Sequence, residues 1–95
     1  MVVGVLRLEL QLYSPQSLKE KRSIVRKIVA RCRNHFPVSA AETGMHDLWQ
    51  RAEIGISMVA GSEADAQSVF DRLESDLLGT ALAEITLQDT EFLHY

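Results

Sequence analysis

The sequence predicts a small α+β domain in which two helices cover one face of a four-stranded antiparallel sheet. Four segments alternate apolar and polar residues, which is the period of a strand with one buried face. Two segments of helical length carry an apolar stripe with the 3.6-residue period of a helix on a core. The order is strand, helix, strand, strand, helix, strand, which is the βαββαβ arrangement of ferredoxin-like domains.

A single domain is expected for residues 1–95, because 46% of the 95 residues are hydrophobic. A chain of this size supports one modest core, which buries roughly 60 to 70% of the unfolded surface. No segment approaches the roughly 20 consecutive apolar residues of a membrane-spanning helix. Arg7 and Glu9 interrupt the apolar N-terminal stretch, which argues against a signal peptide. We therefore expect a cytoplasmic protein with no membrane partner.

The first strand is expected at Val2–Tyr13. Its four leucines fall at alternate positions from Leu6 to Leu12, and charged or amide side chains lie between them. Successive side chains of a strand point to opposite faces, so the leucines should face the core and the polar residues should face away from it.

The first helix is expected over Ser17–Phe36. Ser17 and Glu20 form a capping box at its start, and Pro37 ends it, because the residue before a proline is disfavoured in the helical region. Lys21 points close to the apolar stripe of this helix. We expect its stem to pack there and its ammonium to reach solvent past the first turn.

The first helix also holds most of the positive charge. It has seven of the ten basic residues and one acidic residue, a net charge of +6, whereas the three basic and twelve acidic residues elsewhere carry −9. Phosphate backbones bind clustered lysines and arginines through charge neutralisation and counterion release. The residues predicted to contact nucleic acid are Lys19, Lys21, Arg22, Arg26, Lys27 and Arg33.

Two strands joined by a hairpin are expected next, at Val38–Glu42 and Ala52–Ala60. The first of them has small residues and a weak alternation, which suits an edge of the sheet. The second alternates clearly and places Ile54, Ile56 and Met58 on the core side, which is typical of a central strand.

The second helix is expected from its N-cap at Ser62 to Gly79, with an apolar stripe and acidic exposed positions. Its acidic residues could neutralise the basic helix, either within one molecule or across an oligomer. The last strand is expected at Leu82–Tyr95, with Ile85 and Leu87 facing the same way.

Two segments resemble the YlxP-like family of small bacterial proteins, a domain of unknown function. They are SLKEKR at the start of the first helix and ETGMHDLWQRAEIGIS across the hairpin. The resemblance spans nearly the whole chain and implies a ferredoxin-like fold and a frequently oligomeric protein. It also implies a gene beside those for transcription-elongation, translation-initiation and ribosome-binding factors, which favours an association with RNA or the ribosome. It implies no established activity.

No arrangement in the sequence has the specificity of a catalytic motif, so we expect no enzymatic activity, no cofactor and no metal site. His46 and Asp47 are adjacent, but adjacent residues in an extended segment point to opposite faces, and no third ligand has a plausible spacing. Trp49 is expected to plug the end of the core or an interface. Cys32, the single cysteine, is expected to be a small buried hydrophobe.

The uncovered face of the sheet lacks the aromatic residues with which RNA-recognition sheets stack bases. The outward positions of the two central strands are Arg7, Glu9, Gln11, Glu53, Gly55, Ser57 and Val59. RNA would therefore be contacted by the first helix and neighbouring loops. The same partly apolar, partly charged face suits burial against a second subunit, and we expect a homo-oligomer that assembles through this face or the Val38 edge strand.

These observations predict a non-enzymatic binding module that contacts RNA or the ribosome through the first helix. The alternative is an oligomeric protein-interaction or ligand-sensing domain, in which the basic helix is an interface element that meets an acidic surface. The two differ in one observable. Phosphate binding predicts strong salt dependence and loss on charge reversal, whereas a structural role predicts that charge reversal disturbs assembly or stability.

Overall fold

The computed structural model describes residues 1–95 and contains the six predicted elements in the predicted order. They are β1 (Val2–Leu12), α1 (Leu18–His35), β2 (Ser39–Gly44), β3 (Arg51–Ala60), α2 (Glu63–Gly79) and β4 (Ala83–His94). Every boundary lies within two residues of its predicted position. Neither helix has the length and apolarity that crossing a membrane requires.

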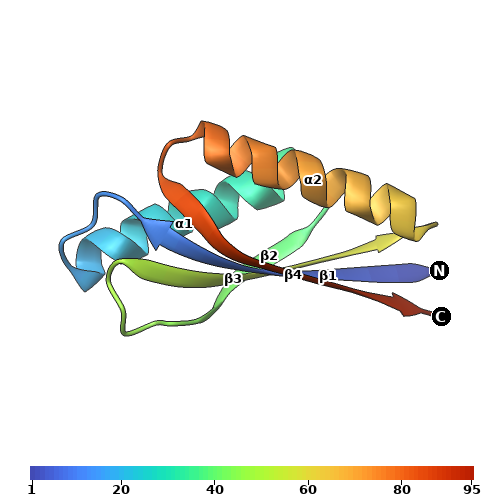
Figure 1. The fold of residues 1–95 in the computed structure, drawn as a ribbon, viewed down its shortest axis with the longest axis horizontal. Coiled ribbons are helices and arrows are strands. Elements are labelled where there is room, and N and C mark those ends of the chain that lie inside the picture. The colour runs from blue at the N-terminus through green and yellow to red at the C-terminus, as the bar shows by residue number, and fades with distance from the viewer.

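The four strands form one sheet in the order β2-β3-β1-β4, and every neighbouring pair is antiparallel. Both helices lie on the same face of the sheet, and the opposite face, here called the outer face, is uncovered (Figure 1). The predicted ferredoxin-like fold is thereby confirmed. The fold leaves the exposed sides of the helices, the outer face and the edges of β2 and β4 open to partners.

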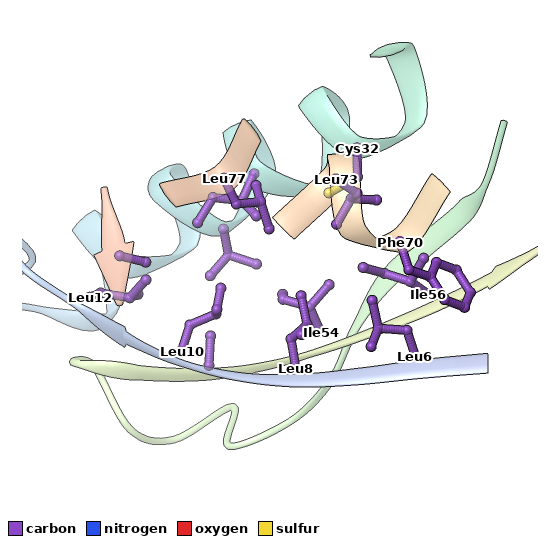
Figure 2. Close-up of a cluster of buried hydrophobic side chains, with 14 residues drawn as sticks. Leu6, Leu8, Leu10, Leu12, Cys32, Ile54, Ile56, Phe70, Leu73 and Leu77 are labelled. Atoms are coloured by element: carbon purple, nitrogen blue, oxygen red, sulfur yellow. The ribbon is translucent and has the colours of Figure 1, made fainter. Parts of the chain in front are cut away.

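The core fills the space between the sheet and the two helices (Figure 2). It is a single cluster of 14 buried hydrophobic residues, to which β1 contributes its four alternating leucines. Full burial of each large apolar side chain contributes roughly 1.5 to 3 kcal/mol. The helices and β3 supply Val25, Ile28, Cys32, Ala52, Ile54, Ile56, Phe70, Leu73 and Leu77.

Side-chain caps begin both helices at the predicted residues. In α1, Ser17 Oγ accepts a hydrogen bond from the Glu20 backbone N–H at 3.2 Å, and the Glu20 carboxylate accepts one from the Gln16 N–H at 2.6 Å. In α2, Ser62 Oγ accepts a hydrogen bond from the Asp65 N–H at 3.1 Å. These contacts satisfy backbone donors that the first helical turn leaves unpaired, and they fix where each helix begins.

One face assignment from the sequence is wrong, because β4 contains a bulge. Leu10 of β1 pairs with Ile85, but the preceding residue, Glu9, pairs with Leu87. The extra residue is Thr86, whose hydroxyl donates to the Glu9 carbonyl at 3.2 Å. The bulge places Ile85 on the core side and Leu87 on the outer face, although their spacing in the sequence predicts a shared face.

Candidate nucleic-acid interface

The seven basic residues of α1 divide according to whether the chain supplies an acidic partner. Lys21 and Arg31 are each paired with an acidic side chain from another element. The other five are exposed and form no ion pair within the chain. These five residues, called the basic face below, are Lys19, Arg22, Arg26, Lys27 and Arg33.

Lys21 lies beneath the first turn of α1 with only 1% of its side chain exposed. Its Nζ lies 2.7 Å from Glu42 Oε2 on β2 and donates a hydrogen bond to the Met45 carbonyl at 2.7 Å. The expectation that this ammonium reaches solvent is therefore wrong, because the carboxylate of β2 holds it inside. Lys21 is occupied by these contacts, so the basic face does not include it.

Arg31 forms a bidentate ion pair with Asp76 of α2. Its Nε lies 2.6 Å from Oδ2 and its Nη2 lies 2.9 Å from Oδ1. This hydrogen bonding raises the pKa of Arg31 and lowers the pKa of Asp76. It is the only ion pair between the two helices. Neutralisation of α1 by α2 within one molecule is therefore limited to Arg31.

Three arginines of the basic face line an open groove between α1 and β2. The groove has a volume of about 460 Å³, and its lining includes Arg22, Arg26 and Arg33 together with Val25, Val29 and Glu42. From the first of these arginines to the last, α1 rises about 16 Å at 1.5 Å per residue. The groove thus presents a row of positive charge on a partly apolar surface, which fits an extended polyanion.

Comparison with known proteins identifies a family but no activity. The family described as "Protein of unknown function (DUF503)" matches residues 3–90. The chain belongs to the DUF503 family. A relative, the "Uncharacterized protein YlxP" of Bacillus subtilis (strain 168), is 33% identical over 91 residues, which cover 96% of this chain and 99% of the relative. The resemblance to the YlxP-like family is thereby confirmed.

Solved structures similar to this DUF503 chain show the fold alone. The structural-genomics protein YJCS has a TM-score of 0.64 and 11% sequence identity, with coverage of 97% of this chain and 99% of that protein. A variant of SnoaB, a cofactor-independent oxygenase from Streptomyces nogalater, has a TM-score of 0.51 and 9% identity, with coverage of 99% and 92%. At such low identity, the oxygenase activity belongs to SnoaB and carries no information about the chemistry of this chain.

The two sequence segments that carry the DUF503 resemblance meet in the structure. SLKEKR supplies Lys21, and ETGMHD supplies both partners of its ammonium, Glu42 and Met45. A structural contact therefore joins the two segments. The sequence indicated only that Lys21 falls beside the apolar stripe of the helix, and it could not identify the partners, which lie more than 20 residues away.

The loop between β2 and β3 is exposed from His46 through Trp49. The chain contains no group of three or more His, Cys, Asp and Glu residues placed to hold a metal ion. Trp49 is 40% exposed and is not part of the buried core cluster, so the expectation that it plugs the end of the core is not confirmed. This loop therefore leaves part of a large aromatic residue accessible to solvent.

Cys32 is fully buried in the core, as expected. Burial raises the pKa of its thiol to about 11. Reactive cysteines instead have a lowered pKa and partial exposure, because the thiolate is the nucleophile. The position of Cys32 is that of a small core residue.

The outer face has charged and apolar regions. Arg7 forms two ion pairs, with Nη1 3.9 Å from Glu53 Oε1 and Nη2 3.4 Å from Asp89 Oδ2. Arg51 forms a third, with Nη2 3.7 Å from Glu9 Oε2. These pairs connect neighbouring strands across the sheet. Toward the chain termini the same face becomes apolar, with Val3, Val5, Val59 and Leu93.

Proposed function

We propose that this protein is a non-enzymatic, cytoplasmic binding module that contacts RNA or the ribosome through the basic face of α1. The observation that carries the proposal is that five exposed lysine and arginine side chains on one helix have no acidic partner within the chain. Unpaired, solvated cations can bind phosphate without first breaking an intramolecular ion pair.

The outer face supports contact by α1 in preference to contact by the sheet. The register between β1 and β3 places the expected polar, small and aliphatic residues on that face, and none of them is aromatic. Arg7 and Arg51 are already paired with acidic residues of neighbouring strands. The outward positions of β1 and β3 therefore offer neither rings for base stacking nor free cations for phosphate.

The proposal is tested by titrating structured ribosomal RNA with the protein over a range of salt concentrations. If all five residues of the basic face contact phosphate, log affinity should fall against log salt with a slope of about −3.5 for single strands or about −4.5 for a duplex. The variant Arg22→Gln, Arg26→Gln, Arg33→Gln should bind more weakly, and its slope should be shallower by about 2 to 3.

A matched control changes total charge by the same amount without touching α1. Ala64→Glu, Ser68→Glu, Ser75→Glu adds three negative charges at exposed positions of α2. This control should bind RNA nearly as well as the wild type. If both triple variants lose binding equally, the net charge rather than the basic face is responsible, and the proposal fails.

A second candidate function is recognition of an acidic protein surface by α1. The favouring observation is that the arginine-lined groove borders β2, which is an edge strand with an unpaired side. An extended acidic segment could add to that edge and place its carboxylates against the arginines. In this case light scattering of the arginine variant would show a changed assembly, while the wild type would ignore RNA even at low salt.

Homo-oligomerisation is part of the same proposal. The apolar part of the outer face and the free edge of β2 are the two surfaces that support it. Pairing through the outer face would leave the basic face exposed, since α1 lies on the opposite side of the sheet (Figure 1). The light-scattering measurement on the wild type gives the number of subunits directly.

A further inference from the structure

Two aromatic residues from different connections, Tyr13 and Trp49, lie next to the same end of the β1–β3 pair. The β1–β3 ladder pairs Gln11 with Arg51, and the Leu12 N–H donates to the Gln50 carbonyl at 2.8 Å. Tyr13 is the residue after Leu12 and Trp49 is the residue before Gln50, so the two aromatic residues flank the last bonded pair at this end of the two strands. Tyr13 is 61% exposed and Trp49 is 40% exposed, so both rings are accessible.

The backbone around these rings is held by contacts that do not involve the rings. The Tyr13 N–H donates to the Leu82 carbonyl at 3.3 Å, and the Leu48 N–H donates to the Met45 carbonyl at 3.1 Å. Buried Lys21 binds that same Met45 carbonyl. Anchored segments can present aromatic rings in a fixed arrangement, which lowers the entropy cost of binding a ligand.

This end of the molecule also carries the beginning of the basic face. The β1–α1 connection, the β2–β3 loop and the start of α1 lie together at the end opposite the chain termini (Figure 1). The Lys21 ammonium joins the loop to the first turn of α1, where Lys19 and Arg22 are exposed. A ligand that contacts both surfaces must therefore combine negative charge with flat, apolar groups.

We propose that Tyr13 and Trp49 form a stacking surface for unpaired bases of a single-stranded RNA segment whose phosphates lie along the basic face. This inference rests on the proposed function and specifies its ligand as single-stranded. Each base has a π-face that can stack on an aromatic ring, whereas the bases inside a duplex are covered by their neighbours. No outward position of β1 or β3 is aromatic, so bases cannot stack on the central strands themselves.

The single tryptophan makes the inference directly measurable. Trp49 fluorescence is recorded while the wild type is titrated with a 12-nucleotide RNA, first as a single strand and then as a duplex with its complement. Stacking should quench the emission with the single strand at concentrations where the labelled RNA shows binding by anisotropy. The duplex, which can occupy the basic face alone, should bind without quenching.

Variants separate the rings from the charges. Trp49→Ala and Tyr13→Ala should each weaken single-strand binding by about 5- to 150-fold, whereas Trp49→Phe should retain most of it. Leu48→Ala is the matched control, since this neighbouring side chain is 49% exposed and has no ring. It should bind like the wild type. Exposed substitutions of this kind should leave the thermal unfolding curve nearly unchanged.

The outcomes distinguish this inference from the proposed function. One outcome is that the arginine variant loses RNA binding while Trp49→Ala binds normally and the wild type shows no quenching. In that case the stacking inference is wrong, and the proposal that the basic face binds RNA is supported. If the wild type binds no RNA, both proposals fail. If Trp49→Ala changes the mass measured by light scattering but not RNA binding, the ring belongs to a protein interface, and the stacking inference is again overturned.

Discussion

At the scale of single residues, the acidic partner of each cation decides what the cation can do. Lys21 and Arg26 lie in the same helix, but Lys21 is enclosed by Glu42 and a carbonyl, while Arg26 borders an open groove. The first cation links α1 to the hairpin, and the second is free for a ligand. Charge content alone therefore overstates the binding surface of α1.

The buried pair predicts a large effect of removing one partner. Lys21→Met keeps most of the buried stem but leaves the Glu42 carboxylate without its cation. We expect the free energy of unfolding to fall by about 3 kcal/mol, toward the low end for a buried pair because 19% of the Glu42 side chain is exposed. Urea denaturation measures this loss. Lys19→Met, an exposed change in the same turn, should alter stability by less than about 0.5 kcal/mol.

The coupling between Lys21 and Glu42 can be isolated with a double-mutant cycle. Lys21→Met, Glu42→Gln removes both charges, so its destabilisation should be smaller than the sum of the two single losses. Strictly additive losses would show that the two side chains do not stabilise each other.

The ion pair between Arg31 and Asp76 predicts a specific pH dependence. Because this pair lowers the Asp76 pKa in the folded state, its contribution to stability is complete above the ordinary carboxyl value of 3.8 and is lost as pH falls through the lower folded pKa. The stability difference between wild type and Asp76→Asn should therefore be larger at pH 7 than at pH 2. Arg31→Gln should show the same trend in thermal unfolding, and equal differences at both pH values would contradict it.

At the scale of elements, the close approach of α2 to β1 depends on a glycine. A Cβ at Gly4 would lie 3.0 Å from the Phe70 ring and 3.2 Å from Ala66, and both neighbours are fully buried. Neither can move away without disturbing the core. This contact explains why the regular alternation of β1 places its smallest residue at a core-facing position.

Alanine substitutions at two glycines should have opposite effects. Gly4→Ala should lower the free energy of unfolding by about 1 to 3 kcal/mol through overpacking. Gly79→Ala should raise it by about 0.4 to 1 kcal/mol, because no atom lies within 4 Å of the added methyl group and the backbone there has no positive φ. Urea denaturation of both variants measures whether the free energy of unfolding falls for Gly4→Ala and rises for Gly79→Ala. A stabilising Gly4→Ala would show that the helix can shift outward.

At the scale of the whole molecule, the positive charge is concentrated on α1, although the net charge of the chain is negative. The chain carries −3 overall, yet α1 alone carries +6. The molecule is about 42 Å long, and at physiological salt the charges of exposed groups are screened beyond about 8 Å. A phosphate group near the basic face is therefore influenced mainly by the local cations. A low sequence pI does not argue against such a surface.

The sequence by itself determined the order of the elements, the inward faces of the elements before β4 and the caps that begin both helices. Each of these depends on residues within a few positions of one another, where the periods of strands and helices and the reach of a capping side chain apply. The same local rules correctly placed Ile54 in the core and Ser17 at the start of α1.

Only the tertiary structure decided which cations are free and which loops lie at the same end of the sheet. Lys21 meets Glu42, Arg31 meets Asp76, and Leu12 bonds to Gln50 beside Tyr13 and Trp49, across separations of 21 to 45 residues. The bulge that turns Leu87 outward likewise appears only in the pairing of β4 with β1. The physical reason is that side-chain periodicity fixes direction within an element, whereas partners are selected by how separate elements pack against one another.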